Sequence, residues 1–307
     1  MTSGAQVVSW NDNVIKQAIA LSFEKSRLRR RLLDYTVIYG LLFCALVVLL
    51  PLFSILTHLI SQGITSLNID FLTKLPKPVG ESGGGMANAL VGTVILLGIA
   101  LLVGVPIGLG SGIYLSEYSG HRFAQIVGFI TDVMNGIPSI VYGIFAYTIF
   151  VLPVKSFSAL SGGMALGIMM VPTVTRTTEQ FLKLVPTSIR EAGLALGVPK
   201  WRVTLDIVLQ MSLGGVVTGI MIALARVAGE TAPLLFTAFG NRFWHSSLMQ
   251  PIAALPLQIF SYAISPYDDW HRQAWAGALV LILMVFLVNL AATYFIKRQT
   301  RVLSHKR

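Results

Sequence analysis

Residues 185–210 read VPTSIREAGLALGVPKWRVTLDIVLQ and separate two long apolar runs. Ser188 and Glu191 match a capping box, S-x-x-E, which predicts that a helix begins at this serine. Gly197 suits the left-handed conformation that ends a helix, and Pro199 suits the first turn of the next helix. The stretch therefore predicts a short helix, a tight glycine break and a second helix that continues into the next apolar run. Taken alone, this pattern fits an ordinary helix–turn–helix connector.

The composition of the chain indicates a lipid environment. The 307 residues are 54% hydrophobic and 12% charged, with a mean hydropathy of +0.73. Soluble domains carry about 25% charged residues, so this chain has about half of that usual share. A single cysteine, Cys44, excludes an intrachain disulfide and a thiolate metal cluster, and the five histidines show no metal-ligand spacing. We expect an integral membrane protein with no metal site.

Six segments are long enough to cross a bilayer, which takes about 20 mostly apolar residues. They lie at about 35–60, 88–115, 123–151, 160–184, 211–239 and 273–296. The third contains Pro138, which predicts a kink. A seventh apolar segment, 248–264, is short and holds two prolines, so it predicts an interfacial or external helix pair. The predicted fold is an all-α integral membrane protein with six transmembrane helices.

The basic residues predict the orientation of these spans. Of the 23 Lys and Arg residues, 16 fall at the two termini and in the inner loops of a six-span scheme, five in its outer loops and two within spans. Cytoplasmic loops collect Lys and Arg, so both termini are expected to be cytoplasmic. The net charge of +10 is then a topology signal and does not indicate nucleic-acid binding. The predicted organisation is a cytoplasmic tail over 1–34, a permease domain over 35–298 and a second cytoplasmic tail over 299–307.

Glycines repeat at a spacing that suits helix packing in lipid. Gly104, Gly108 and Gly112 recur every four residues in the second span, and Gly215 and Gly219 do so in the fifth. Small residues at this spacing let two helix backbones approach closely. The glycine-rich stretch 80–88 lacks the Lys-Ser/Thr of a P-loop, so no ATP-binding motif is present and no catalytic residue is expected in this chain.

Ionisable residues lie inside two predicted spans. The run IALARVAGETAPLL, 222–235, carries Arg226 and Glu230, and the fourth span carries Arg176 and Glu179. Each charge at the bilayer centre costs about 2.5–3.5 kcal/mol on insertion scales, so these side chains should face protein or a water-filled path. Asp132 in the third span is a weaker candidate for the same environment.

Two interpretations of these charges stay open. Arg226 and Glu230 are four residues apart, which predicts that both lie on one face of a helix. They could form a structural ion pair, within the fifth span or across to the fourth. Alternatively, the arginines give a passing anion a transient positive site, and the carboxylates balance them so that the anion can leave.

The loop quoted first resembles the EAA loop of ATP-binding-cassette (ABC) importer permeases. Glu191, Ala192 and Gly193 stand where that motif has Glu-Ala-Ala, and Gly197 stands at its glycine. The sequence departs from the motif at Gly193 and at Gln210, where the family has Ala and Pro. The resemblance implies the type I ABC importer permease fold, with a coupling helix that docks on a separate ATPase. It also implies that ATP and Mg²⁺ bind to that partner, so this chain needs no cofactor.

Further segments resemble phosphate-importer permeases of the PstA type. They are GIPSIVYGIFAY (136–147), VPTVTRTTEQFLKLVP (171–186), ARVAGETAPLLFTAFGN (225–241) and MQPIAALPLQIFSYAISP (249–266). The resemblance runs from about residue 35 to residue 298. It implies a transport subunit of the inner membrane whose partners are a second permease of the PstC type, an ATPase dimer of the PstB type and an external phosphate-binding protein of the PstS type.

Three rival functions are weighed against this expectation. A permease for another oxyanion or small solute would share the fold. A secondary transporter or channel without an ATPase would not need an EAA-type loop, and such proteins often show two similar halves, which are not evident here. A structural assembly factor would leave the intramembrane charges without a role.

Overall fold

The computed structural model describes residues 12–78, 81 and 83–304 of the chain. The regular secondary structure of this part is helical, apart from two isolated β-bridges, Pro76 with Gly84 and Phe239 with Ile252. Loops connect the helices. The helices are α1 (Asp12–Ser66), α2 (Ile69–Thr73), α3 (Ala87–Glu117), α4 (Arg122–Gly136), α5 (Ser139–Ala146), the π-helix η1 (Tyr147–Val151), α6 (Leu152–Val154), α7 (Ala159–Lys183), α8 (Thr187–Ala195), α9 (Lys200–Arg202), the π-helix η2 (Val203–Val208), α10 (Leu209–Ala228), α11 (Ala232–Thr237), α12 (Leu255–Ala263) and α13 (Asp268–Ser304).

The chain divides into two compact units, Met1–His58 and Leu59–Arg307. The described part of the first unit is a single element, the long helix α1, which begins within the predicted N-terminal tail and contains the first predicted span. Its residues from Leu33 onward are strongly apolar, and the side chains over 33–55 are exposed within this chain. Such a surface suits lipid or another apolar partner.

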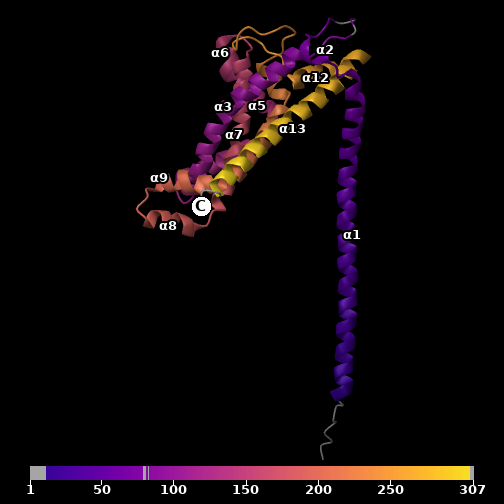
Figure 1. Cartoon of the computed structure of the whole chain (residues 1–307), viewed down its shortest axis with the longest axis vertical. Helices are drawn as coiled ribbons and strands as arrows, with labels where there is room; N and C mark the ends of the chain where they lie inside the picture. Colours follow the sequence, from indigo (N-terminus) through magenta and orange to yellow (C-terminus); the bar gives the residue numbers. More distant parts are fainter. Residues whose placement is uncertain (1–11, 79–80, 82, 305–307) are drawn as a thin grey trace, which may run out of the picture. The chain divides into compact units, whose positions relative to one another are not determined.

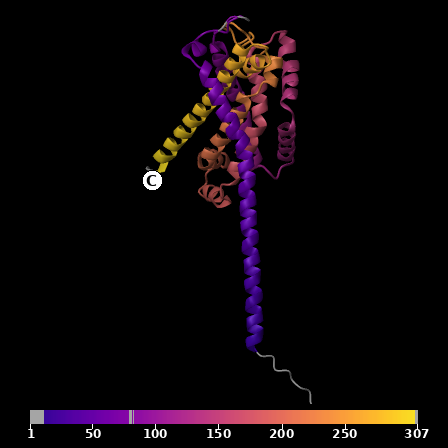
Figure 2. The same cartoon turned by 90° about the vertical axis from the view of Figure 1, so that its right-hand side faces the viewer.

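The second unit is built around α7. Its most extensive helix pair is α3 with α7, and α10 packs on α7 as well. Figures 1 and 2 show these helices running between two ends of the unit, with α8 and α9 at one end and α2 and α12 at the other. The core of this unit therefore lies between α3, α7 and α10.

Close backbone approach explains the glycine pattern. A Cβ on Gly108 of α3 would lie 2.6 Å from Cβ of Val174 in α7, and a Cβ on Gly112 would lie 2.6 Å from Cβ of Thr178. On α10, Gly219 faces Thr177 of α7, where a Cβ would lie 2.3 Å from the threonine hydroxyl. Real Cβ atoms do not fit at these distances, so the prediction that the repeated glycines serve helix packing is confirmed.

The prediction of six transmembrane helices is confirmed in part. Among the described residues, four helices are long and apolar enough to cross a membrane, or five if the bent α4–α6 segment counts as one span. The predicted fourth span forms α7, which has 25 residues but is too polar to be recognised by composition. Much of α7 is buried by protein, so it does not need a continuous apolar surface.

Two predicted spans are broken inside their expected limits. The predicted third span breaks between α4 and α5, which are bent by 108°, more than a proline kink alone would give. The predicted fifth span, 211–239, begins earlier, at Lys200, and its helix ends at Ala228. The segment 248–264 forms one helix, α12, in place of the expected helix pair.

Candidate functional site

A cluster of charged side chains joins α4 to the C-terminal half of α7. Arg176 of α7 donates from Nε to Asp132 Oδ1 at 2.8 Å and from a terminal nitrogen to Asp132 Oδ2 at 2.6 Å. Its other terminal nitrogen donates to Glu179 Oε2 at 2.5 Å, and Lys183 donates to Glu179 Oε1 at 2.6 Å. Two cations and two carboxylates thus meet in one neutral group. Such mutual pairing is how ionisable groups are held within a membrane protein.

The position of Gly128 lets the Arg176 guanidinium reach the backbone of α4. A terminal nitrogen of Arg176 donates to the Gly128 carbonyl at 2.7 Å, and a Cβ at Gly128 would lie 3.4 Å from that nitrogen. The cluster lines an open cavity of about 390 Å³. The Asp132 side chain is 65% exposed, whereas that of Glu179 is 10% exposed. Glu179 is therefore the carboxylate whose charge depends most on its protein partners.

Two helix breaks lie next to each other. The first is Ile137–Pro138, between α4 and α5, and the second is Gly229–Thr231, between α10 and α11. A Cβ on Gly143 of α5 would lie 2.9 Å from Cα of Pro233 in α11, so the two segments that follow the breaks are in close contact. Non-helical backbone at membrane depth occurs where protein buries it or where it lines a water-filled cavity.

The second break changes the geometry expected for Arg226 and Glu230. Arg226 lies in the last turn of α10, whereas Glu230 lies beyond its end, in the non-helical segment. The expectation that both lie on one face of a single helix is wrong, because the helix stops at Ala228. Within the described side chains, Arg226 forms no ion pair with Glu230.

The depth of Arg226 follows from the packing of α10 on α7. Gly215 lies against Phe181 and Gly219 against Thr177, so the two helices are antiparallel. Two further turns of α10, about seven residues, place Arg226 level with Met170. Met170 lies at the middle of α7. Arg226 is thus exposed in this chain and lies level with the middle of α7.

Tyr142 is a buried partner of this region that the sequence did not single out. It is 6% exposed, and its hydroxyl donates to the Met134 carbonyl at 2.7 Å across the α4–α5 break. The same carbonyl also accepts from the backbone N–H of Ile137, so it is bonded on both sides of the break. Lys183 was missed as well, although its i+4 spacing from Glu179 is visible in the sequence.

The loop over 185–210 has the predicted glycine break, but its first helix starts at a different residue. Gly197 has φ +78°, and it follows α8 in a Schellman arrangement in which Val198 N donates to Gly193 O and Gly197 N donates to Leu194 O. The predicted capping box is wrong, because α8 begins at Thr187 directly after Pro186 and no side chain caps it. Pro186 takes the N-cap position, two residues before Ser188, so Ser188 lies inside the helix and cannot act as the cap.

The four predicted loop residues differ in their exposure. Glu191, Ala192 and Gly197 are exposed, whereas Gly193 is buried. A Cβ on Gly193 would lie 3.0 Å from a methyl group of Val203 in η2. The departure from a third alanine at this position therefore relieves a tight contact between α8 and the start of the next long helix.

Arg190 fixes α8 to the ends of two long helices. It donates from Nε to Glu117 of α3 at 3.2 Å, and its terminal nitrogens donate to the carbonyls of Val185 and Leu182 at 2.9 and 2.8 Å. Lys200 adds a bond to the Glu117 carbonyl at 3.0 Å. The exposed face of the loop presents Leu196, which is 84% exposed. The bonds of Arg190 and Lys200 thus link the segment around α8 to the ends of α3 and α7.

Comparison with known proteins identifies the family. The model of the family described as "Binding-protein-dependent transport system inner membrane component" matches residues 104–301. The chain is also 44% identical over 278 residues to the phosphate transport system permease protein PstA of Yersinia pestis, with 90% of this chain and 92% of that protein covered. This chain belongs to the PstA permease family. The corresponding protein of Xylella fastidiosa strain Temecula1 is 43% identical, over 88% of this chain and 94% of the relative.

Solved structures agree on the fold. A chain of the MetNI methionine ABC transporter, crystallised in inward facing conformations, matches with a TM-score of 0.56 and 19% sequence identity. The match covers 70% of this chain and 94% of that chain. At this identity the likeness shows the fold alone, which is that of an ABC importer permease.

Family membership settles the class of the protein. It is a multi-pass membrane protein and a permease subunit of an inner-membrane ABC transport system. It is not itself an enzyme, because the ATPase of such a system is a separate subunit.

Proposed function

We propose that this chain is the transmembrane permease of an ATP-driven importer of inorganic phosphate. The observation that carries the proposal is the match along about nine-tenths of the chain to permeases that are named for phosphate transport. A second, homologous permease of the PstC type would complete the path. An ATPase dimer of the PstB type would bind at the coupling loop, and a phosphate-binding protein of the PstS type would deliver the anion outside.

The chain would cross the membrane six times, with both termini in the cytoplasm. α7 has 25 residues, which corresponds to about 38 Å of helix and is enough to span the hydrocarbon core. The bent α4–α6 segment would cross as one broken span, supported by α7 and α11. The basic residues at both ends of the chain support this orientation.

Arg226 would provide the positive site that the anion meets within the membrane. Its guanidinium has no carboxylate partner in the described part of the chain and lies next to two helix breaks, where water and polar backbone are tolerated. Glu230, two residues beyond the end of α10, would limit the affinity so that phosphate is released. Arg176 and Glu179 would contribute further along, although their charges are already paired.

α8 would couple transport to ATP hydrolysis through Glu191, Ala192, Gly193 and Gly197. The helix is short, exposed on one side and fixed through Arg190 to the helices that carry the charged residues. A cleft in the ATPase that closes on α8 would therefore displace the inner ends of α3 and α7. This mechanism requires no nucleotide site on the permease.

Reconstitution of the purified transporter in liposomes tests the proposal. With ATP inside and the external binding protein outside, the vesicles should accumulate radioactive phosphate. Arg226→Gln should lower the rate at least about tenfold, since a hydrogen bond to a charged group contributes about 1.5–3 kcal/mol. Arg122→Gln, which removes an exposed cation at the start of α4, should transport normally. Import of a different solute in place of phosphate by the wild type would refute the proposed substrate.

A further inference from the structure

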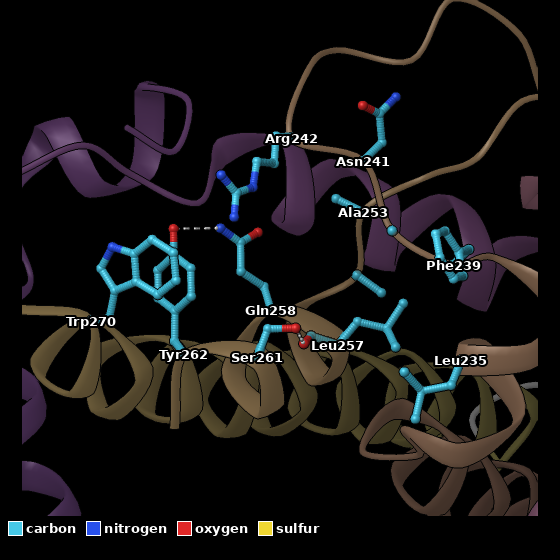
Figure 3. A pocket seen from close by; sticks show the side chains of 12 residues that line it. Leu235, Phe239, Asn241, Arg242, Ala253, Leu257, Gln258, Ser261, Tyr262 and Trp270 are labelled. Carbon is cyan, nitrogen blue, oxygen red and sulfur yellow. Dashed lines mark hydrogen bonds between the residues drawn. The ribbon is translucent and has the colours of Figure 1, made fainter. Parts of the chain in front are cut away.

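A second cavity, lined by both apolar and polar residues, lies at the end of the unit opposite α8 and α9. It has a volume of about 250 Å³ and is lined by the end of α11, the residues that follow it, one side of α12 and Trp270 of α13 (Figure 3). None of the residues discussed for the membrane path lines this cavity. Its polar side chains are Asn241, Arg242, Gln258, Ser261 and Tyr262.

Arg242 places a positive charge at this cavity. The side chain is exposed, and its guanidinium carbon lies 5.6 Å from the centre of the Trp270 ring. Among the described side chains no carboxylate forms an ion pair with Arg242. In Figure 3 the guanidinium points toward the Gln258 amide and the Tyr262 hydroxyl. The charge therefore remains available to a ligand.

Tyr262 supplies a second, buried group. Its side chain is 5% exposed and stacks on Trp270 with ring centres 4.4 Å apart. The amide of Gln258 donates to its hydroxyl oxygen at 3.3 Å, and the hydroxyl proton has no acceptor within the described part of the chain. Burial raises the pKa of the Tyr262 hydroxyl, against the opposing effects of Gln258 and Arg242, so the group stays protonated and can donate.

The other polar groups near this cavity would weaken the binding of an anion. Ser261 already donates its hydroxyl to the Leu257 carbonyl, so its oxygen is an acceptor. A neighbouring cavity on the other side of Trp270 is lined by Glu81, Asp268 and Asp269, of which Asp269 pairs with Arg272. These carboxylates oppose the charge of Arg242 at longer range. A ligand held here would be released readily.

One short helix separates this cavity from the helix break at Glu230 in the sequence. α11 has six residues, about 9 Å of helix, and it links the break at Glu230 to the loop that carries Arg242. The chain turns between them through Phe239 and Gly240, which have φ +61° and +89°. Phe239 stacks on Phe157 with ring centres 4.7 Å apart, which holds this turn in place.

We propose that this cavity is an outer binding site for an oxyanion, with the Arg242 guanidinium, the Gln258 amide and the Tyr262 hydroxyl as its donors. Phosphate released outside would be held there briefly before it passes along α11 to Arg226. The identity of the anion rests on the proposed function, whereas the existence of the site can be tested separately. The site would increase the local concentration of the anion at the outer opening.

Trp270 is a built-in reporter of binding. The purified transporter, in detergent and without the external binding protein, is titrated with inorganic phosphate while tryptophan emission is recorded, with sodium chloride of equal ionic strength as the reference. We expect a saturable change that disappears in Trp270→Phe. Arg242→Gln should raise the half-saturating phosphate concentration at least about tenfold, and Arg242→Lys should raise it less. Arg272→Gln, which removes a nearby cation outside the cavity, should behave like the wild type.

Uptake measured with the same variants separates this inference from the proposed function. If the wild type imports phosphate but its Trp270 emission does not respond, the outer site is refuted while the function stands. If Arg242→Gln weakens only the affinity for the binding protein and leaves the phosphate titration unchanged, Arg242 is a docking residue and the proposal is again refuted. A phosphate response in a transporter that imports another solute would support the site and contradict the proposed substrate.

Discussion

The Arg176 guanidinium holds Asp132 through two hydrogen bonds, of 2.8 and 2.6 Å, although the two residues lie 44 positions apart. The same guanidinium donates to Glu179 on its own helix. This bidentate geometry gives more specificity than a single ion pair. It fixes α4 to α7 close to the point where α4 breaks.

The two carboxylates of this cluster should contribute unequally to stability. Asp132→Asn removes a charge that is mostly exposed to solvent, and we expect a loss of less than about 1 kcal/mol. Glu179→Gln leaves Arg176 and Lys183 without a buried carboxylate between them, and we expect a loss of about 3 kcal/mol. Thermal unfolding of the purified transporter compares the two variants. Asp70→Asn, which breaks an exposed pair with Lys74, is the control. Equal shifts for Asp132→Asn and Glu179→Gln would contradict this ranking.

Exchanging the charges of Arg226 and Glu230 should not restore transport. These residues form no ion pair in the described structure, so the double variant Arg226→Glu with Glu230→Arg does not rebuild a clamp between helices. It instead moves the positive group past the end of α10. We expect the subunits to assemble and phosphate uptake to stay below about a tenth of the wild-type rate. Co-purification of the subunits measures assembly, and near-normal uptake would leave only a structural role for this pair.

Gly197→Val should uncouple the permease from its ATPase. The glycine has φ +78°, where a β-branched residue is strained by about 1–2 kcal/mol, although the space around it is open. We expect normal insertion in the membrane but weaker binding of the ATPase subunit and lower transport-stimulated ATP hydrolysis. Gly120→Val is the matched control, since Gly120 also has open surroundings but no positive φ. Wild-type stimulation of ATP hydrolysis in Gly197→Val would defeat this interpretation.

Accessibility of single cysteines tests the proposed topology. Cys44 is the one cysteine in the sequence, so Cys44→Ala provides a cysteine-free background. In that background Ser246→Cys, in the loop after α11, should react with a membrane-impermeant maleimide added to spheroplasts. Ser119→Cys, between α3 and α4, should react after the membrane is permeabilised. The reverse pattern would overturn the six-span orientation.

Features that depend only on residues close together in the sequence were predictable from the sequence alone. The apolar composition predicted a helical membrane protein, and the repeated glycines predicted the close packing of α3 and α10 on α7. Gly197 was recognised because a helix end needs a residue that tolerates positive φ. The capping box failed at the same loop because Pro186, two residues before Ser188, already starts the helix.

Contacts between side chains that are far apart in the sequence depend on the tertiary structure. Arg176 and Glu179 are neighbours on one helix, but the approach of Asp132 depends on how α4 lies on α7. The separation of Arg226 from Glu230 depends on where α10 stops, and a regular helical periodicity does not reveal a break inside an apolar run. Arg242 lies at the same cavity as Tyr262 because a β-bridge between Phe239 and Ile252 joins the segment after α11 to the segment before α12. Local spacing predicts contacts within a helix, whereas contacts between helices are set by side-chain packing over the whole unit.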